Sequence, residues 1–337
     1  MNHLLKKMST YRRVVIDTLG DLSTVRADEK SFPALQDNEI LVKMEFTTLN
    51  PSDYYTTMGG YPSNTFPTII GLEGSGTVTQ AGSDAYAQSL LHKRVAVRGP
   101  GTWSEYITSS ADEVFPLLDS TTFEQAANLI VNPMTVALFM EIIKAGNHKA
   151  IIQNAAASAL GKMLIRWGKL EGIHVVNLVR RQEQVDVLSA LGTDLILNTS
   201  EENWKAKASE LLKSVGGATI GFDAIAGSGT NELMELLENG STLYTYGRLS
   251  GEDCKTAPRQ IMMLGKTLKG LWLMPWLASK TREQRVEVGN LVQSLLGPVF
   301  HTDHSKTIHL GTVKDALINY KNESATNNKI LVRTAFD

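Results

Sequence analysis

Residues 149–181, KAIIQNAAASALGKMLIRWGKLEGIHVVNLVRR, decide the fold of this chain. An apolar strand over 149–153 is followed by a turn of small residues over 154–161, then by a helix. A second apolar strand over 174–179 completes the stretch. A strand, a helix and a second strand in this order predict one βαβ unit.

The turn over 154–161 is suited to a phosphate group. Laid on the dinucleotide fingerprint G-x-G-x-x-G, it places Ala156, Ser158 and Gly161 at the three glycine positions, so one glycine remains. The small residues still allow backbone N–H groups at a helix N-terminus to approach a pyrophosphate. The turn therefore predicts a dinucleotide site.

The second strand runs directly into Arg180 and Arg181. Sites for NAD commonly place Asp or Glu here, roughly 20 residues beyond the turn, to bind the ribose hydroxyls. Two guanidiniums would instead hold a 2′-phosphate through charge-assisted hydrogen bonds. The pair favours NADPH as the cofactor; the alternative is that both arginines are only the solvated end of a strand.

Strands and helices continue to alternate beyond this unit. Glycines at 172, 192, 216 and 240 end the helices. The predicted strands cover residues 149–153, 174–179, 194–197, 218–223, 241–246 and 267–273. This alternation predicts an α/β fold with a doubly wound parallel Rossmann sheet, in strand order 3-2-1-4-5-6, within a domain over 126–275.

The rest of the chain predicts a second, β-rich domain. Residues 1–125 read as short strands and turns, and 276–337 complete the domain, with a final strand KILVRTAF that returns to it. Thr121 and Glu124 fit a capping box, and Pro133 fits the first position of the next helix. Residues 301–310, HTDHSKTIHL, read as irregular.

Composition excludes several classes of partner. The chain has 337 residues, a net charge of −2 and 20% charged residues, which indicates neither nucleic acid nor an anionic membrane surface. No apolar run approaches the roughly 20 residues of a membrane span. The single cysteine, Cys254, excludes an intramolecular disulfide and favours a reducing compartment, taken as the cytoplasm. The basic N-terminus weakly resembles a transit peptide, which is the alternative.

Several motifs, in order along nearly the whole chain, resemble the medium-chain dehydrogenase/reductases. They are NPSDYYTTMGGYP, GLEGSGTV, RVAVRGPGTWSEYI, NPMTVAL, NAAASALGKM, VVNLVRR, YTYGRLSG and LKGLWLMPW. Within that superfamily the chain is similar to the zinc-independent quinone oxidoreductases and 2-enoyl thioester reductases. The resemblance implies a GroES-like catalytic domain beside the Rossmann domain, and a homodimer paired through the apolar edge strand 267–273.

The resemblance also implies a set of cofactor contacts. They are Asn132, Thr135, Ala157, Ser158, Ala159, Leu160, Arg180, Arg181, Gln182, Tyr246, Gly247, Arg248, Leu249, Leu271, Trp272, Leu273 and Lys329. Two of these have an equally simple alternative: Trp272 as a core or dimer-edge residue, and Tyr246 as an ordinary strand tyrosine.

The positions that resemble the zinc ligands of alcohol dehydrogenases are Asn50 and Leu72, and neither side chain is a plausible ligand. We therefore expect no metal. Tyr61, in the GGYP turn, resembles the catalytic tyrosine of the enoyl thioester reductases, and its phenol could donate a hydrogen bond to a developing enolate. The alternative for Tyr61 is a surface turn tyrosine.

These features together predict an NADPH-dependent oxidoreductase that transfers hydride to a small conjugated acceptor, a quinone or an α,β-unsaturated carbonyl, without zinc. One alternative is a trans-2-enoyl thioester reductase acting on enoyl-CoA or enoyl-ACP in fatty acid synthesis. The other is a non-catalytic NADPH-binding protein.

Overall fold

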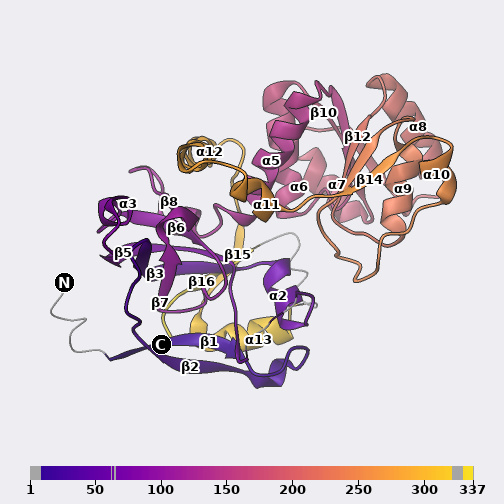
Figure 1. Ribbon diagram of the computed structural model, residues 1–337. Coiled ribbons are helices and arrows are strands. Elements are labelled where there is room, and N and C mark those ends of the chain that lie inside the picture. The colour runs from indigo at the N-terminus through magenta and orange to yellow at the C-terminus, as the bar shows by residue number, and fades with distance from the viewer. Residues whose placement is uncertain (1–8, 62, 64–65, 321–328, 337) are drawn as a thin grey trace. The chain divides into compact units, whose positions relative to one another are not determined.

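The computed structural model describes residues 9–61, 63, 66–320 and 329–336 (Figure 1). The chain divides into two compact units. Unit 1 comprises Met1–Met134, Lys280–Leu296 and Thr302–Asp337, and unit 2 comprises Thr135–Ser279 and Gly297–His301. In these described residues, no helix is both long and apolar enough to cross a membrane.

Unit 2 is built on a six-stranded parallel sheet in the order β11-β10-β9-β12-β13-β14. Its strands are β9 (Ala150–Gln153), β10 (His174–Val179), β11 (Ile196–Asn198), β12 (Ile220–Asp223), β13 (Thr242–Thr245) and β14 (Thr267–Gly270). The central strands are almost wholly buried because helices cover both faces of the sheet. This order confirms the predicted sequence 3-2-1-4-5-6.

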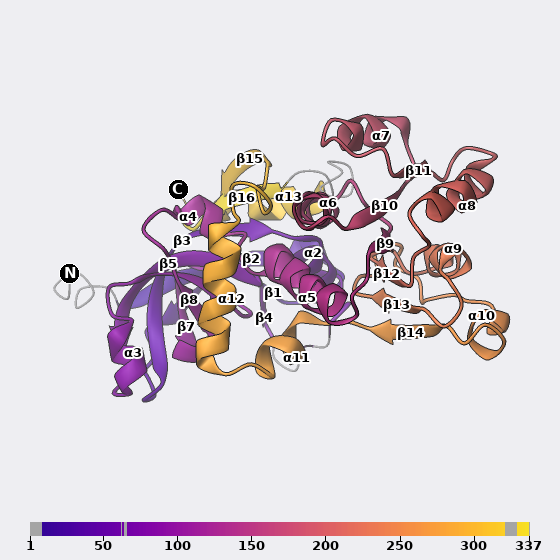
Figure 2. The same cartoon turned by 90° about the horizontal axis from the view of Figure 1, so that it is seen from above.

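Helices cover this sheet on two sides. The helices are α5 (Val131–Ala145, which begins in unit 1), α6 (Ala159–Glu171), α7 (Gln182–Ser189), α8 (Trp204–Ser214), α9 (Ser228–Leu236), α10 (Pro258–Met262) and α11 (Leu273–Ala278). The neighbouring helices α8 and α9 share one core with β9, β10 and β13 (Figure 2). Phe139 of α5 stacks on Phe222 of β12, with ring centroids 4.0 Å apart. Gly172, with φ of 69°, ends α6 as predicted.

Unit 1 contains two sheets. The larger has seven strands on the path β15-β16-β3-β5-β6-β8 with β7 paired to β3, and the smaller has the order β2-β1-β4. The strands are β1 (Thr10–Ile16), β2 (Val25–Ser31), β3 (Glu39–Leu49), β4 (Thr68–Ile69), β5 (Glu73–Ala81), β6 (Arg94–Arg98), β7 (Tyr106–Ser110), β8 (Val114–Pro116), β15 (His304–His309) and β16 (Lys329–Arg333). The closing strand β16 pairs antiparallel with β3, which confirms its predicted return.

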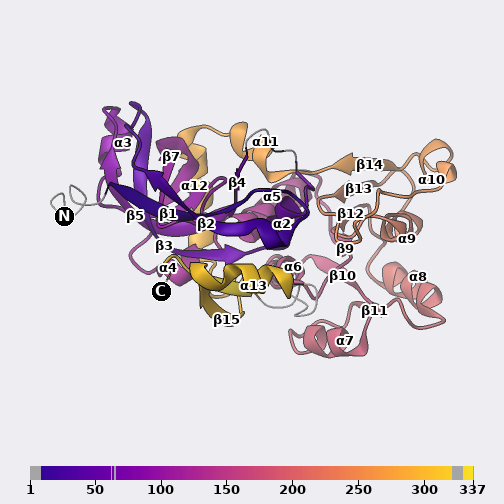
Figure 3. The same cartoon turned by 90° about the horizontal axis from the view of Figure 1, so that it is seen from below.

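The helices of unit 1 are short, apart from α12. The α-helices are α2 (Pro51–Thr57), α3 (Ala85–Ser89), α4 (Phe123–Ala126), α12 (Arg282–Ser294) and α13 (Val313–Ile318), and the 3-10 turns are η1 (Leu22–Thr24), η2 (Ala111–Glu113) and η3 (Leu310–Thr312). Helix α13 packs against β1 and β16 (Figure 3). Its Leu317 joins Ile16 and Val332 in a core that also contains the buried Trp103.

Several boundary predictions were wrong. The strand predicted over 267–273 ends at Gly270, where its pairing with β13 stops, and Leu273 begins α11. Pro275 lies in the first turn of α11, where a missing N–H costs no helical hydrogen bond. The capping box belongs to Thr122 and Gln125, one residue later than predicted.

Two further predictions and one omission concern Pro133, β15 and β2. Pro133 is the third residue of α5 and not the first, because the helix already begins at Val131. The stretch predicted as irregular contains β15, which pairs parallel with β16 but is mostly solvent-facing. Strand β2 was not predicted at all, since six of its seven residues are not buried and it carries no alternating pattern.

Candidate functional site

The turn between β9 and α6 has the form that a phosphate requires. Ser158 caps α6, and its Oγ accepts a hydrogen bond from the Gly161 N–H at 3.1 Å. A Cβ atom at Gly161 would lie 2.4 Å from the backbone oxygen of Ala156, so only glycine fits. Ala157, within this turn, is buried. The single glycine left in the fingerprint is thus the one that close packing of helix and turn demands.

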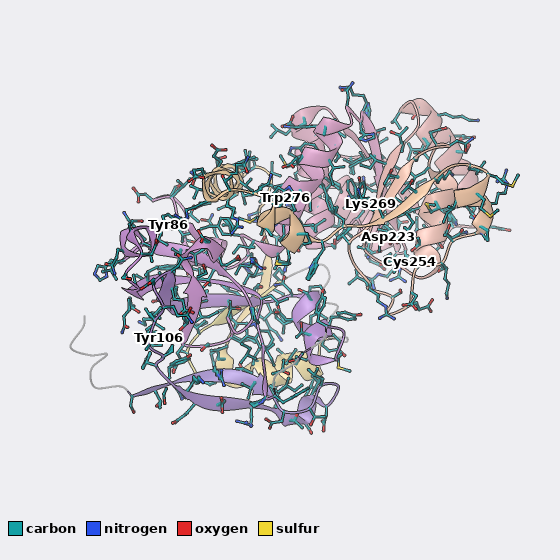
Figure 4. The ribbon with its side chains drawn as sticks, in the orientation of Figure 1. Tyr86, Tyr106, Asp223, Cys254, Lys269 and Trp276 are labelled. Atoms are coloured by element: carbon teal, nitrogen blue, oxygen red, sulfur yellow. The ribbon has the colours of Figure 1, made fainter. Side chains whose placement is uncertain are left out.

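Polar side chains that the sequence reading missed support this turn from the neighbouring strand. Asn154 follows β9, and its Nδ2 donates to Asp223 Oδ1 at 2.7 Å. Asp223 ends β12 (Figure 4) and also accepts from the N–H groups of Ile225 and Ala226 and from Thr230 Oγ1. A polar residue directly after one apolar strand, and another as the last residue of a second strand, were the signal available in the sequence.

The ends of β9, β10, β12 and β13 form what we call the carboxyl edge of unit 2. Ligands of doubly wound folds bind at this edge, where the strand order reverses. Here β9 lies between β10 and β12. The predicted contacts that follow β9, β10 and β13 therefore share one edge of the sheet.

The residues predicted to read the 2′-phosphate lie at the end of β10. Arg180, Arg181 and Gln182 are all exposed. The Arg180 N–H donates to Gln184 Oε1 at 3.0 Å, and Arg181 occupies the cap position of α7. Both guanidiniums thus stand in solvent one strand away from the phosphate turn, a placement that suits an anionic group.

The segment after β13 lies alongside the end of β12. The Tyr246 N–H donates to the Asp223 carbonyl at 2.9 Å, and the Leu249 N–H donates to the Ala224 carbonyl at 3.1 Å. A Cβ at Gly247 would lie 2.6 Å from that Ala224 oxygen. Arg248 pairs with Asp253 at 3.2 Å. Tyr246 packs edge-on against Phe139, and burial, with Asp223 nearby, raises the pKa of its phenol.

The remaining candidates, on α5 and around the start of α11, are more scattered. Leu271 continues the contact with β13 through its N–H, which donates to the Thr245 carbonyl at 2.9 Å. Trp272 is 63% exposed and caps α11, so the core alternative is wrong, whereas Leu273 is buried. Asn132 and Thr135 lie three residues apart near the start of α5, both half-buried, on neighbouring positions of the helix surface. Their contacts with a cofactor stay predictions.

In unit 1, Tyr61 lies just beyond α2 and is 39% exposed. Its ring meets that of Tyr55 edge-on, with centroids 5.2 Å apart. Partial burial, followed by the influence of Tyr55 and Asp53, raises the pKa of the Tyr61 phenol. The phenol therefore stays neutral at physiological pH and can donate a hydrogen bond.

Behind α2 lies a set of four buried polar side chains, Asn50, Asp53, Glu73 and Lys329, which we call the buried acid–lysine cluster. Asn50 connects two of its members: its Nδ2 donates to Glu73 Oε1 at 3.0 Å, and its Oδ1 accepts from Lys329 Nζ. Lys329 was predicted as a cofactor contact; its ammonium is buried within unit 1 and bonded to Asn50. Burial lowers the Lys329 pKa, against the opposing effect of Glu73.

The cluster does not fit a zinc ion. The position that would carry a thiolate ligand holds Asn50, which is already bonded to a carboxylate and an ammonium. The second ligand position holds Leu72, which has no donor atom. Throughout the described ranges, no group of three His, Cys, Asp or Glu side chains could hold a metal.

Comparisons with known proteins match both halves of the chain. The family described as "Alcohol dehydrogenase GroES-like domain" matches residues 36–119, and the family described as "Zinc-binding dehydrogenase" matches residues 159–287. A mitochondrial enoyl-[acyl-carrier-protein] reductase from Caenorhabditis elegans is 30% identical over 74% of this chain and 74% of its own.

Solved structures agree with the fold. A Mesorhizobium loti protein assigned as an NADPH:quinone reductase aligns with a TM-score of 0.85 at 26% identity, covering 97% of this chain and 99% of that one. The quinone oxidoreductase of Escherichia coli, solved with NADPH, has the same fold: TM-score 0.85 at 21% identity, covering 96% and 99% of the two chains. The chain thus belongs to the medium-chain dehydrogenase/reductase superfamily, whose two domains it contains and whose quinone oxidoreductases and enoyl thioester reductases it is similar to.

Proposed function

We propose that the protein is an NADPH-dependent oxidoreductase that reduces a small conjugated acceptor, a quinone or an α,β-unsaturated carbonyl, without zinc. The observation that carries this proposal is the carboxyl edge of unit 2. It places a phosphate turn without bulk one strand away from two exposed guanidiniums, Arg180 and Arg181. The relatives named above, which are reductases, support it.

The residues of unit 2 fit NADPH. Residues 157–160 would hold the pyrophosphate at the N-terminus of α6, and Arg180, Arg181 and Gln182 would hold the 2′-phosphate. When bound, NADPH supplies the hydride that the acceptor takes up. The other predicted contacts, Asn132, Thr135 and residues 246–249 and 271–273, would position the nicotinamide end.

Reduction of a carbon–carbon double bond next to a carbonyl leaves negative charge on the carbonyl oxygen. Without a Lewis acid, a donor from this chain must stabilise that charge. We assign this role to Tyr61, whose raised pKa keeps its phenol protonated. A quinone can accept electrons without protonation at carbon and so depends less on this donor.

Tyr61 favours one specific form of this activity, trans-2-enoyl thioester reduction. It lies at the end of the segment NPSDYYTTMGGY, which resembles enoyl thioester reductases, and the Caenorhabditis elegans relative carries that activity in its name. Acceptors are tested by following NADPH absorbance with an enoyl thioester, an enone and a quinone. Oxidation with at least one of them is expected, and tight NADPH binding without oxidation by any would show a non-catalytic binding protein.

We also propose a homodimer, formed through β14. This strand is the edge of the unit 2 sheet (Figure 2), and three of its four residues are exposed. Large apolar side chains nearby are exposed as well, among them Trp272 at 63% and Met262 at 81%. Light scattering at micromolar concentration should give twice the mass of the chain, and a monomer would refute the dimer.

We keep the prediction of a cytoplasmic location. Cys254, the single cysteine, is a free and exposed thiol, as a reducing compartment allows (Figure 4). The Caenorhabditis elegans relative is named as mitochondrial, which makes the basic N-terminus the segment to examine. Imaging of the full chain with a C-terminal tag in its own cells would separate the two locations.

A further inference from the structure

The buried acid–lysine cluster has an unbalanced set of charges. Asp53 and Glu73 are 0% and 1% exposed, and Lys329 is 3% exposed. If all three were ionised, the cluster would bury a net charge of −1, which a low-dielectric interior strongly disfavours. One additional proton makes the cluster neutral.

Hydrogen bonds decide which carboxyl group takes that proton. Glu73 accepts three: from Asn50 Nδ2, and from the N–H groups of Ile130 and Val131 at 2.9 and 2.8 Å. The last two lie at the start of α5, where the helix dipole also favours a negative charge. Burial raises the pKa of Glu73 as well, but Lys329 and these three hydrogen bonds oppose that rise. Glu73 is therefore the better stabilised of the two carboxyl groups in its ionised form.

Asp53 has far less support. Its Oδ2 accepts one hydrogen bond, from the Asn50 N–H at 2.7 Å. Its Oδ1 is buried and has no hydrogen-bond partner among the described residues. A buried carboxylate oxygen without a donor is costly, whereas the protonated form removes the charge. The proton of the cluster therefore belongs on Asp53.

Asp53 is connected to Tyr61 through a short rigid path. Two residues after Asp53 on α2, the Tyr55 ring packs edge-on against Tyr61. The Gly60 N–H donates to the Tyr55 carbonyl at 2.9 Å, and a Cβ at Gly60 would lie 2.2 Å from the Tyr55 ring. The position of α2 thus determines where the Tyr61 turn lies.

We propose that the buried acid–lysine cluster holds one proton on Asp53, and that this proton makes Asp53 a positioning residue for Tyr61. Loss of the proton leaves a buried negative charge that strains the anchoring of α2 and acts on the phenol. The effect on turnover rests on the proposed function, while the proton itself does not. The titratable groups that face Asp53 are Glu73 from β5, Lys329 from β16, Tyr61 after α2 and Tyr320 after α13.

A proton held on Asp53 makes the stability of the folded protein depend on pH. Burial raises the pKa of Asp53 to about 7 in the folded protein, compared with about 3.9 for an aspartate in an unfolded chain. Between these two values the folded state binds more protons than the unfolded state, so stability falls as pH rises. The unfolding equilibrium constant contributed by Asp53 rises by up to about tenfold per pH unit across this window.

The test compares denaturant unfolding of the wild type and of Asp53→Asn between pH 4.5 and pH 7. Asparagine stays neutral, so the ratio of the two unfolding constants, wild type over variant, should increase by about 100-fold or more across the range. Asp315→Asn is the matched control, because Asp315 lies exposed in the first turn of α13, and its ratio should stay flat. A flat ratio for Asp53→Asn would overturn the proposal.

A second measurement, made on the wild type alone, tests the proposal even if Asp53→Asn does not fold. In wild-type protein labelled with carbon-13 at aspartate carboxyl groups, one resonance should titrate near pH 7. If every aspartate resonance titrates below about pH 5, the proton is not on Asp53.

Turnover then tests the positioning role. The kcat of the wild type with an enoyl thioester should fall as pH rises through about 7, whereas Asp53→Asn should lack this limb. A limb that persists in Asp53→Asn would remove Asp53 from this role. Absence of enoyl turnover in both proteins would count against the proposed function. The unfolding and carbon-13 results would still show whether Asp53 holds the proton.

Discussion

Two buried aspartates show how differently the two units are built. Asp223, in unit 2, and Asp53, in unit 1, are both 0% exposed. Asp223 accepts four hydrogen bonds, from two backbone N–H groups and two side chains. Within the part of the chain that the structure describes, Asp53 accepts one, and its Oδ1 has no hydrogen-bond partner. Burial alone therefore does not determine what a carboxyl group does; the number of donors aimed at it does.

This difference indicates that the two regions have separate roles. At the carboxyl edge of unit 2, four hydrogen bonds to the oxygens of Asp223 tie the ends of β9 and β12 together. The segment over 50–61 of unit 1 contains the Asp53 carboxyl group, whose pKa burial raises to about 7, and the neutral phenol of Tyr61. Binding and proton handling should therefore respond to different substitutions.

The largest effect should come from Asp223→Ala, which leaves four donors around a buried site without an acceptor. We expect a loss of about 3 to 5 kcal/mol in the free energy of unfolding, measured by denaturant titration. Asp223→Asn is the matched control. It keeps one acceptor oxygen and turns an NH2 group toward Thr230, whose hydroxyl can accept, so its cost should be clearly smaller. Equal losses would show that charge, and not donor satisfaction, matters at this edge.

The double variant Arg180→Ala/Arg181→Ala tests binding at the same edge. NADPH affinity should weaken by about 2 to 4 kcal/mol, a sum of two charge-assisted contacts, while NADH affinity changes little. Isothermal titration with both cofactors measures this. Lys213→Ala, which removes an exposed cation in the last turn of α8, serves as control and should leave both affinities unchanged. Equal weakening for NADPH and NADH would show that the arginines do not read the 2′-phosphate.

Tyr61→Phe tests the other region. Turnover of an enoyl thioester should fall by roughly 100-fold, about 2.7 kcal/mol, with NADPH affinity unchanged and with quinone turnover less affected. Tyr86→Phe, at a half-buried tyrosine of α3, controls for loss of a hydroxyl in unit 1 (Figure 4). Unaltered enoyl turnover in a folded Tyr61→Phe protein would remove Tyr61 from the chemistry.

The smallest effect should come from Ser158→Ala. The variant loses the hydrogen bond from the Gly161 N–H to the capping oxygen of α6, which should cost about 1 kcal/mol of stability. Ser158→Thr keeps the hydroxyl and should recover most of it. A Ser158→Ala protein as stable as the wild type would mean that the cap makes no net contribution.

Local patterns were enough to predict most of the fold. Short apolar runs, separated by helices that end at glycines, predicted the six parallel strands. Their order followed because alternating strands and helices form a doubly wound sheet. Arg180 and Arg181 could be placed at the end of β10 because they directly follow such a strand; their contact with a cofactor stays a prediction. Trp272 was misplaced because an apolar run does not distinguish a strand from an exposed helix cap.

The contacts between buried polar side chains could not be predicted from the sequence, because they join residues that are far apart along the chain. Lys329 contacts Asn50, 279 positions away, and Asn154 contacts Asp223, 69 positions away. No local period marks such a pair. In the sequence, Glu73 is only one residue of a motif. The fold shows that its carboxylate accepts hydrogen bonds from the N–H groups at the start of α5. A polar residue at or directly after the end of a buried strand is the one signal that could have identified Asn154 and Asp223.

Deuterium transfer tests the central claim of a hydride-transferring reductase most directly. NADPH labelled at the transferable position of its nicotinamide ring is mixed with the protein and an enoyl thioester, and the product is examined by mass spectrometry. We predict a saturated thioester that carries the deuterium on the β-carbon, formed with NADPH much faster than with NADH. Labelled NADPH that stays intact with enoyl thioester, enone and quinone alike would contradict the claim.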